Sequence, residues 1–332
     1  MKIRNPRSLS IILIYLGLNF AIVFTAMQSG QEEAEPGKAA SKLAPEFTHI
    51  EGLDYFHLRD KIPQLSVSAD KMRSLGEELA EFDVPRGSYN YEQKQQTINY
   101  EAKKGVYRKK KELLTLNEDV RITSEDAEYL ADSVKYFLKQ DLILGSGGVV
   151  FNGEDLKSKD KINITSETMR ANPGIQFSIF QGSVKGSMER KKKYEGRMTF
   201  SSQQLQLEGV KSLAHLEGDV KMHRDAYFIT AGKADIYLEN YNKSLKYFVF
   251  NDDVKVTETL KTETGLTQRK AYAERLEGFG REQKMILSGA PRVEQGADVV
   301  KGYRITIREK VDLIEVDDAM SDMQVKKQKK KN

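Results

Sequence analysis

The 332-residue sequence predicts an all-β protein of about 14 to 16 antiparallel strands, stacked one on the next and preceded by a single transmembrane helix. Three observations predict this organisation. A seven-residue phrase recurs along the chain, apolar and polar residues alternate within each copy, and one long apolar stretch lies close to the N-terminus. Equal spacing of such a phrase is typical of a repeat architecture.

Residues 1–28 are predicted to form a cytoplasmic stub and a membrane anchor. The apolar residues 9–27 are long enough to cross a hydrocarbon core of about 30 Å. Basic residues precede this stretch and acidic residues follow it, so the rest of the chain is expected on the far side of the membrane. A cleaved signal peptide is the alternative. The apolar run is longer than the usual signal core of about 7–15 residues, which favours an uncleaved anchor.

Two segments are predicted to lie outside the β region. Residues 29–45 are rich in Glu, Ala, Gly and Lys without apolar periodicity, which is typical of a linker. Residues 319–332 form a basic tail, where most of the formal net charge of +4 is concentrated. Such a tail is usually solvated, with contact to anionic lipid as a second interpretation. No helical reader or aromatic platform accompanies the charge, so nucleic acid is not an expected partner.

The recurring phrase begins with a large apolar residue. Glu, Gly or Asp stands two places later, then Val or Pro after two more, and Lys or Arg follows directly. The five copies occupy residues 116–122, 180–186, 216–222, 250–256 and 287–293, and the wide first gap has room for a degenerate copy near residues 144–148. Because alternate side chains in a strand point to opposite faces, each copy presents one apolar row and one polar row. The basic residue falls in the polar row and is expected to face water.

The middle of each phrase is expected to bend the strand, because Gly and acidic residues are poor strand formers. Pro291 cannot donate to a ladder, so its copy is expected at an edge or a bulge. Ala followed by a charged residue recurs between the phrases, at Ala69, Ala102, Ala127, Ala234 and Ala273. A small inward residue suits a place where two sheets converge or where a lumen stays open. Turns are predicted at residues 152–153, 172–174 and 301–302.

Catalytic and metal-binding patterns are absent from the sequence. The four histidines have no metal-ligand spacing, and no nucleophile elbow or phosphate loop is present. The sequence has no Cys, which excludes disulfides and thiolate metal sites. No enzyme activity, cofactor or metal is therefore predicted. Two basic runs, residues 108–111 and 190–193, are interpreted as solvated hairpin tips, with phosphate contact as the alternative.

The combination of a short stub, one membrane span and an all-β region with this phrase resembles the lipopolysaccharide-transport proteins LptC and LptA, the OstA-like family. Residues 216–222 through 234–238 carry the closest likeness, and residues 250–254 and 273–274 continue it. Residues 46–210 look more like LptC and residues 211–318 more like LptA. The sequence leaves open whether the two parts form one continuous jellyroll or two joined by a turn near residues 208–213.

The resemblance implies a half-open β-jellyroll with a hydrophobic groove that shields the acyl chains of lipopolysaccharide. It implies a single-pass inner-membrane protein, mostly periplasmic, that accepts the lipid from an ABC transporter complex and passes it along stacked jellyrolls paired through their edge strands. The residues expected to line the groove are apolar residues within or just before four of the phrases and in one later strand: Leu114, Leu116, Val120, Ile122, Leu216, Val220, Met222, Phe248, Phe250, Val254, Val256, Leu287, Ile305 and Ile307. An anchored β-repeat scaffold with a packed interior is the second hypothesis, and an enzyme acting on envelope polymers is the third.

Overall fold

The computed structural model describes residues 47–59, 62–75, 78–91, 96–154, 160–189, 197–224, 226–238, 245–262, 265–279, 282–308, 313–318 and 320–322. The chain divides into two compact units, residues 1–44 and 45–332, and the described residues all belong to the second. The predicted anchor, the linker and nearly all of the basic tail lie outside the described residues. Within the described part of the chain, no helix has the length and hydropathy needed to span a membrane.

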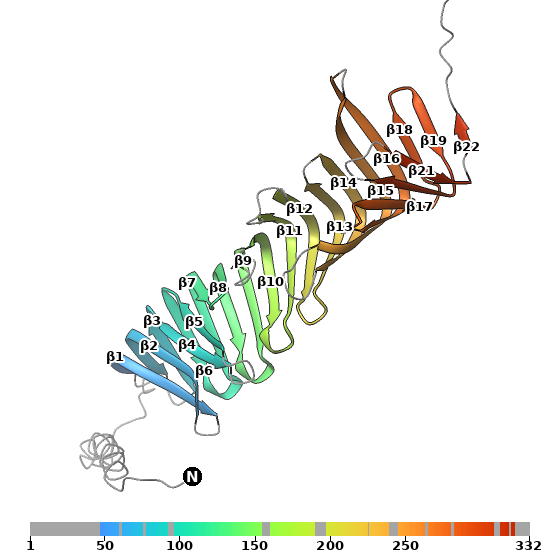
Figure 1. The fold of residues 1–332 in the computed structure, drawn as a ribbon. Coiled ribbons are helices and arrows are strands. Elements are labelled where there is room, and N and C mark those ends of the chain that lie inside the picture. Colours follow the sequence, from blue (N-terminus) through green and yellow to red (C-terminus); the bar gives the residue numbers. More distant parts are fainter. Residues whose placement is uncertain are drawn as a thin grey trace, which may run out of the picture. The chain divides into compact units, whose positions relative to one another are not determined.

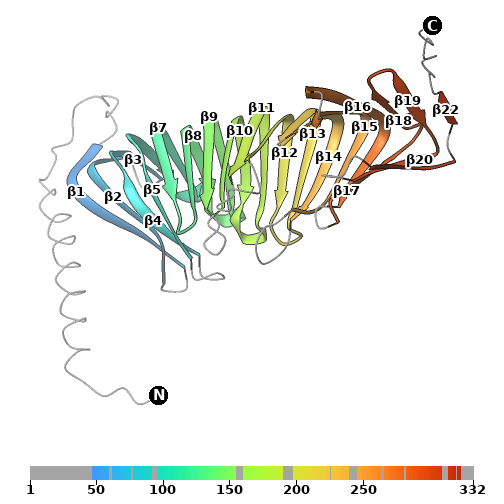
Figure 2. The same cartoon turned by 45° about the horizontal axis from the view of Figure 1, so that its top comes forward.

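The described residues form an all-β, jellyroll-like stack of antiparallel strands, from β1 in blue to β22 in red (Figures 1 and 2). From β7 to β16 each strand pairs with the next in the sequence, whereas nearer the two ends some pairs skip a strand, such as β5 with β7 and β17 with β20. The strands are β1 (Phe47–Arg59), β2 (Ile62–Leu75), β3 (Leu79–Asp83), β4 (Arg86–Tyr91), β5 (Gln96–Glu101), β6 (Lys104–Arg108), β7 (Leu113–Thr123), β8 (Ala127–Phe137), β9 (Leu142–Glu154), β10 (Lys161–Asn172), β11 (Phe177–Glu189), β12 (Arg197–Glu208), β13 (Leu213–Arg224), β14 (Tyr227–Leu238), β15 (Leu245–Thr262), β16 (Gly265–Phe279), β17 (Lys284–Ser288), β18 (Arg292–Gln295), β19 (Asp298–Lys301), β20 (Arg304–Arg308), β21 (Leu313–Asp317) and β22 (Met320–Asp322).

The 22 strands of the described residues exceed the predicted number of about 14 to 16. Toward both ends of the stack, two short strands take the place of one long, bent strand. β2, for example, pairs through residues 71–75 with β3 and through residues 65–68 with β4, and β16 pairs in the same way with β17 and β18. The sequence pattern predicts the rows of the sheet, but it does not show which bends interrupt the ladder.

The recurring phrase marks the bend of every second long strand, from β7 to β15, and the break between the short strands β17 and β18. The pairing register shifts within the phrase, as between Asn117 and Val120 of β7 and between Glu217 and Val220 of β13. Two consecutive residues there have positive φ, a left-handed conformation that turns the strand. The pairs are Glu118 and Asp119, Gly182 and Ser183, Gly218 and Asp219, Asp252 and Asp253, and Gly289 and Ala290, with Gly147 and Gly148 as the degenerate copy. The predicted bend is confirmed, including in the copy that contains Pro291, which lies between β17 and β18.

The bends divide the stack into two walls that face each other. The first wall contains β4, β5, β18, β19, β22 and one part of each long strand. In a strand with a phrase this is the part that begins at the Val, such as Val120 in β7 or Val254 in β15, and in the other long strands it is the part paired with it. The second wall contains β3, β6, β17, β20, β21 and the other parts. Aromatic rings meet across the space between them, in the pairs Tyr55–Tyr107, Tyr89–Tyr136 and Phe151–Phe180, with centroids 5.6, 4.9 and 6.0 Å apart.

One continuous hydrophobic core fills most of the space between the walls, since the buried side chains of both walls belong to a single cluster. Several inward positions are glycines that lie directly opposite an aromatic residue of the next strand. Gly87 faces Tyr100, Gly186 faces Phe200, and Gly278 faces Phe248. A Cβ atom at Gly278 would come within 1.9 Å of the Phe248 ring, so this ring packs flat on the backbone of β16.

The ladder continues without a break through residues 208–213. β12 and β13 are joined by a short turn and pair from Glu208 opposite Leu213 to Met198 opposite Arg224. The predicted turn at Asn152 and Gly153 is wrong, because both residues lie inside β9. The Asn152 side chain accepts a hydrogen bond from Asn163 at 2.7 Å and donates one to Glu128 at 3.0 Å. These contacts explain why an Asn-Gly pair, usually typical of turns, extends a strand here.

Candidate functional site

The inward face of both walls is the candidate site, because it is a continuous apolar surface with open space in one region. All fourteen residues predicted to line a groove are buried there, each with 7% exposure or less. They come from both walls: Leu116 and Phe250 precede the bends of their strands, and Val120 and Val254 follow them. The predicted apolar face is therefore the inner face. Contact of these residues with a lipid stays a prediction.

The recurring alanines lie on the same inner face. Ala69, Ala102, Ala234 and Ala273 are 1–8% exposed, and each stands next to the bend of its strand or at the break between two short strands. A small side chain is needed there because the two walls converge at the bends. The prediction that small inward residues mark converging sheets holds for these four positions. Ala127 differs, because it lies at the opposite margin of the first wall.

Two adjoining cavities open between the walls in the middle of the stack. One has a volume of about 300 Å³ and is lined on the first wall by Ile122, Tyr129 and Phe151 and on the second by Met169 and Leu207. The other, of about 220 Å³, shares Phe151 and Leu207 and extends along β9 to β13. Both lie at the margin of the walls away from the bends, where the 124–126 and 209–212 turns leave the apolar interior open.

The cavity lining is mainly apolar, with polar groups held at its edges. Burial raises the pKa of Tyr129 to about 12, as expected for a hydroxyl in apolar surroundings. Phe151 lies with its ring centroid 4.8 Å from that of Tyr129 and 6.0 Å from that of Phe180, which links the two walls by aromatic contacts. Such an apolar space, with few polar groups, suits hydrocarbon better than a polar ligand.

Only one predicted site residue, Ile122, lines a cavity that opens between the walls in this region. The lining residues missed by the sequence analysis belong mostly to β8 to β13, among them the apolar Phe151, Met188 and Leu207, with Ile98 of β5 in addition. These strands alternate in the same way as the phrases. That alternation was the available signal, but it gives no indication of which inward positions remain uncovered.

A row of directly opposed inward residues follows the first wall near its margin. At β8 to β12 its members are apolar or glycine, and from β13 onward they are polar. The row runs Ala127, Gly153, Ile162, Met188, Met198, Arg224, Tyr227, Glu258, Arg269 and Gln295. The cavities coincide with its apolar half. In its polar half, Arg269 and Glu258 are 2% and 5% exposed and form an ion pair.

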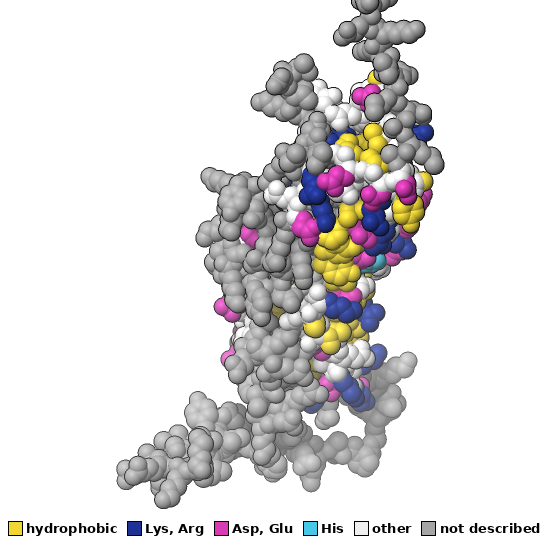
Figure 3. Space-filling model, turned by 45° about the vertical axis from the view of Figure 1, so that its right-hand side comes forward, with side chains coloured by type: hydrophobic (Ala, Val, Ile, Leu, Met, Phe, Trp, Pro, Cys, Tyr) yellow, Lys and Arg dark blue, Asp and Glu magenta, His cyan; other side chains and the backbone are white. Residues whose placement is uncertain are grey.

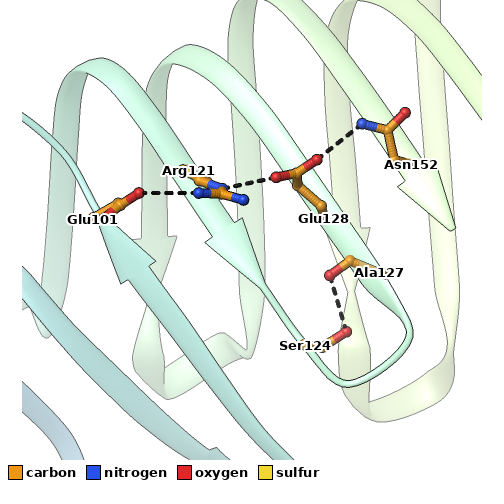
Figure 4. A network of polar contacts seen from close by, with 6 residues as sticks. All are labelled: Glu101, Arg121, Ser124, Ala127, Glu128 and Asn152. Carbon is orange, nitrogen blue, oxygen red and sulfur yellow. Dashed lines mark hydrogen bonds and ion pairs between the residues drawn. The ribbon is translucent and has the colours of Figure 1, made fainter.

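The outward face is polar, and the basic residue of every phrase is exposed there as predicted: Arg121, Lys185, Lys221, Lys255 and Arg292. Figure 3 shows basic and acidic side chains interspersed on one face, with some hydrophobic side chains between them. Figure 4 shows part of this surface, where Arg121 lies between Glu101 and Glu128, and Asn152 donates to Glu128. In the described part of the chain, no group of three or more His, Asp or Glu side chains is arranged to hold a metal ion.

Comparison with known proteins gives this fold a family. The model of the lipopolysaccharide-assembly, LptC-related family matches residues 14–178. The model of the LptA/LptD N-terminal-domain lipopolysaccharide transport protein matches residues 199–312. The chain therefore belongs to the lipopolysaccharide-transport proteins, with an LptC-like part followed by an LptA-like part.

One solved structure is similar to part of this chain. It is LptH, described as the LptA homologous periplasmic component of the conserved lipopolysaccharide transport device from Pseudomonas aeruginosa. The match covers 39% of this chain and 95% of that one, at 12% identity and a TM-score of 0.35. Among curated proteins, none matches the sequence.

Proposed function

We propose that this protein carries lipopolysaccharide by taking its acyl chains between the two walls, with the saccharide part outside. The observation that carries this proposal is the pair of apolar cavities at Phe151 and Leu207, which open at the margin of a continuous apolar interior. Burial of each CH₂ of an acyl chain there would be favourable by about 0.8 kcal/mol. Transfer driven in this way needs no catalytic step.

The anchor and the location are part of the same proposal. Residues 9–27 would hold the protein in the inner membrane, with the β region in the periplasm. The lipid would come from an inner-membrane ABC transporter complex. The LptC-like part would receive it and the LptA-like part would pass it on, since the ladder joins the two parts directly.

Partner jellyrolls would add to the two ends of the stack. Among the described strands, β1 pairs only with β2, while β21 pairs only with β20 and β22 only with β19. Each of these strands therefore has one edge available for backbone hydrogen bonds to a further strand.

Site-specific photo-crosslinking tests the acyl-chain site. A photoreactive residue at Phe151 or Leu207 is expected to capture labelled lipopolysaccharide, and so are those at Met222 and Phe250 if the walls part to admit the chains. Controls at Lys221 and Lys255, which point outward from the same strands as Met222 and Phe250, are expected to capture little. Capture by the two lysine positions and not by the inward positions would contradict the assignment of faces.

An anchored scaffold remains the competing function, and the closed packing around Phe250 and Leu287, both 0% exposed, is the observation that favours it. The two functions differ in their response to free hydrocarbon. A delipidated carrier would bind a fluorescent acyl probe, and Leu207→Glu would weaken the binding. A scaffold would bind no probe, with or without this substitution.

A further inference from the structure

The outward side of the first wall contains a hollow that the proposed acyl-chain site does not use. It has a volume of about 470 Å³ and extends over β10 to β14. Its centre is formed by short side chains, Ser187, Thr199 and Ser201, with Lys185 and Lys221 on either side. Ser201 lies directly opposite both lysines in the ladder. Strands are about 4.8 Å apart, so the two lysine backbones are separated by about 10 Å.

The cations around this hollow are unusual among the phrases. In the other copies the basic residue has an acidic partner: Arg121 with Glu128, Lys255 with Asp253, and Arg292 with Glu294. Among the described residues, no carboxylate forms an ion pair with Lys185 or Lys221.

The carboxylate places that serve Lys255 and Arg292 are filled differently in these two copies. Two residues after the cation, Ser187 and His223 stand in the place of Glu294. Two residues before the cation, the place of Asp253 is taken by Ser183 in one copy. In the other copy it is taken by Asp219, which accepts a hydrogen bond from Gln203 instead. The two uncompensated cations are thus the two that flank the hollow.

Further polar groups complete the lining. Arg197 donates to the Ser187 hydroxyl at 3.3 Å, and His223 lies opposite Thr199. No Asp or Glu is among the described residues that line this hollow, although Glu189, opposite Arg197, lines the neighbouring one. Cations and hydroxyls without carboxylates are the groups that bind phosphate.

An aromatic side chain adds a second kind of surface. Phe228 lies opposite His223 at the side of the hollow and is 40% exposed, although it belongs to a strand with a buried inner face. An exposed ring beside phosphate-binding groups offers an apolar surface to the ring of a sugar.

We propose that this hollow binds a phosphorylated saccharide, with its phosphate between Lys185 and Lys221 and its sugar ring against Phe228. The site lies on the face opposite to the apolar interior. The proposal therefore does not depend on acyl-chain binding, and either can fail without the other.

Isothermal titration of the full-length protein at constant ionic strength tests this proposal. The probes are glucose 1-phosphate, inorganic phosphate and glucose. Glucose 1-phosphate is expected to bind, inorganic phosphate to bind more weakly, and glucose to give no heat. Lys221→Gln is expected to lower the affinity for glucose 1-phosphate about tenfold, through loss of one charge-assisted hydrogen bond. Phe228→Ala is expected to lower the affinity for glucose 1-phosphate and to leave the affinity for inorganic phosphate unchanged.

Lys255→Gln is the matched control, because Lys255 has the same place in its phrase but lies outside the hollow. Its effect on all probes is expected to be negligible. No saturable binding of glucose 1-phosphate, or equal losses in Lys221→Gln and Lys255→Gln, would overturn the site. Equal affinity for both phosphates, unaffected by Phe228→Ala, would overturn the saccharide assignment and identify a free-phosphate site.

Discussion

Arg269 and Glu258 form a buried ion pair between directly opposed residues of β16 and β15. The Arg269 Nη2 and Nε atoms lie 2.5 and 2.8 Å from Glu258 Oε2. Both side chains continue inward rows that hold Val256 and Ala271, so they stand where other strands place apolar residues. The pair therefore fills an inward place with two charges that neutralise each other, and its integrity should matter for folding.

Arg269→Met should destabilise the protein by about 3–5 kcal/mol, because Glu258 would be left buried without its cation. Urea denaturation measures the change. Arg275→Met is the control on the same strand: its partner is Glu277, both side chains are partly exposed, and the expected cost is below about 1 kcal/mol. Equal costs for the two variants would contradict the buried-pair argument. The double variant Glu258→Leu with Arg269→Met is expected to recover most of the loss.

Gly278→Ala should also be destabilising, although it adds only one methyl group. The new Cβ would lie within 1.9–2.3 Å of three atoms of the Phe248 ring, so the ring has to leave its place on the inner face. Overpacking of this kind costs about 1–3 kcal/mol. Gly145→Ala is the matched control, since its Cβ would meet neighbours only at 3.4 Å or more. If thermal unfolding shows the same midpoint for both variants, the ring does not pack on Gly278 as described.

The sequence predicted the inner face well because alternation within a strand is a local property. Inward residues of one phrase stand an even number of positions apart. Leu116 and Val120 are an example, and so are Phe250 and Val254. The two residues with left-handed backbone conformation at each bend were harder to predict from the sequence. They are Gly182 and Ser183 in one copy but Glu118 and Asp119 in another, so no single residue type marks them.

The cavities and the ion pair could not be predicted from the sequence, because both depend on long-range register. Phe151 and Leu207 are 56 positions apart in the chain and meet only across the two walls. Glu258 and Arg269 fit the alternation as inward residues, yet isolated charges in a strand usually face solvent. Only the pairing of β15 with β16 shows that each neutralises the other.

The bend itself predicts the effect of substitutions at Asp219. This residue has φ of 47°, where Asn and Asp are tolerated better than other non-glycine residues. Asp219→Val should destabilise the protein by about 1–2 kcal/mol or more, because a β-branched side chain is strained in the left-handed region. Asp219→Asn should have little effect. Similar unfolding free energies for the Val and Asn variants in urea would show that the bend is not left-handed at this residue.

Acid should weaken the protein partly through Glu128, at the centre of the network in Figure 4. The hydrogen bond from Asn152, followed by that from Arg121, lowers the pKa of Glu128 below its ordinary value. A carboxyl group with a lowered folded-state pKa contributes stability that is fully present above its unfolded pKa of about 4.3 and is lost as pH falls through the folded value.

Asn152→Ala removes the largest cause of the shift, so the pKa of Glu128 should rise toward its ordinary value, and Arg121→Gln should raise it less. Carboxyl NMR titration measures both changes. Glu128→Gln should also make unfolding free energy less dependent on pH between about 5 and 3, because this variant has no proton to bind there. A Glu128 pKa at or above the ordinary value in the unmodified protein would mean that Asn152 and Arg121 do not stabilise the carboxylate.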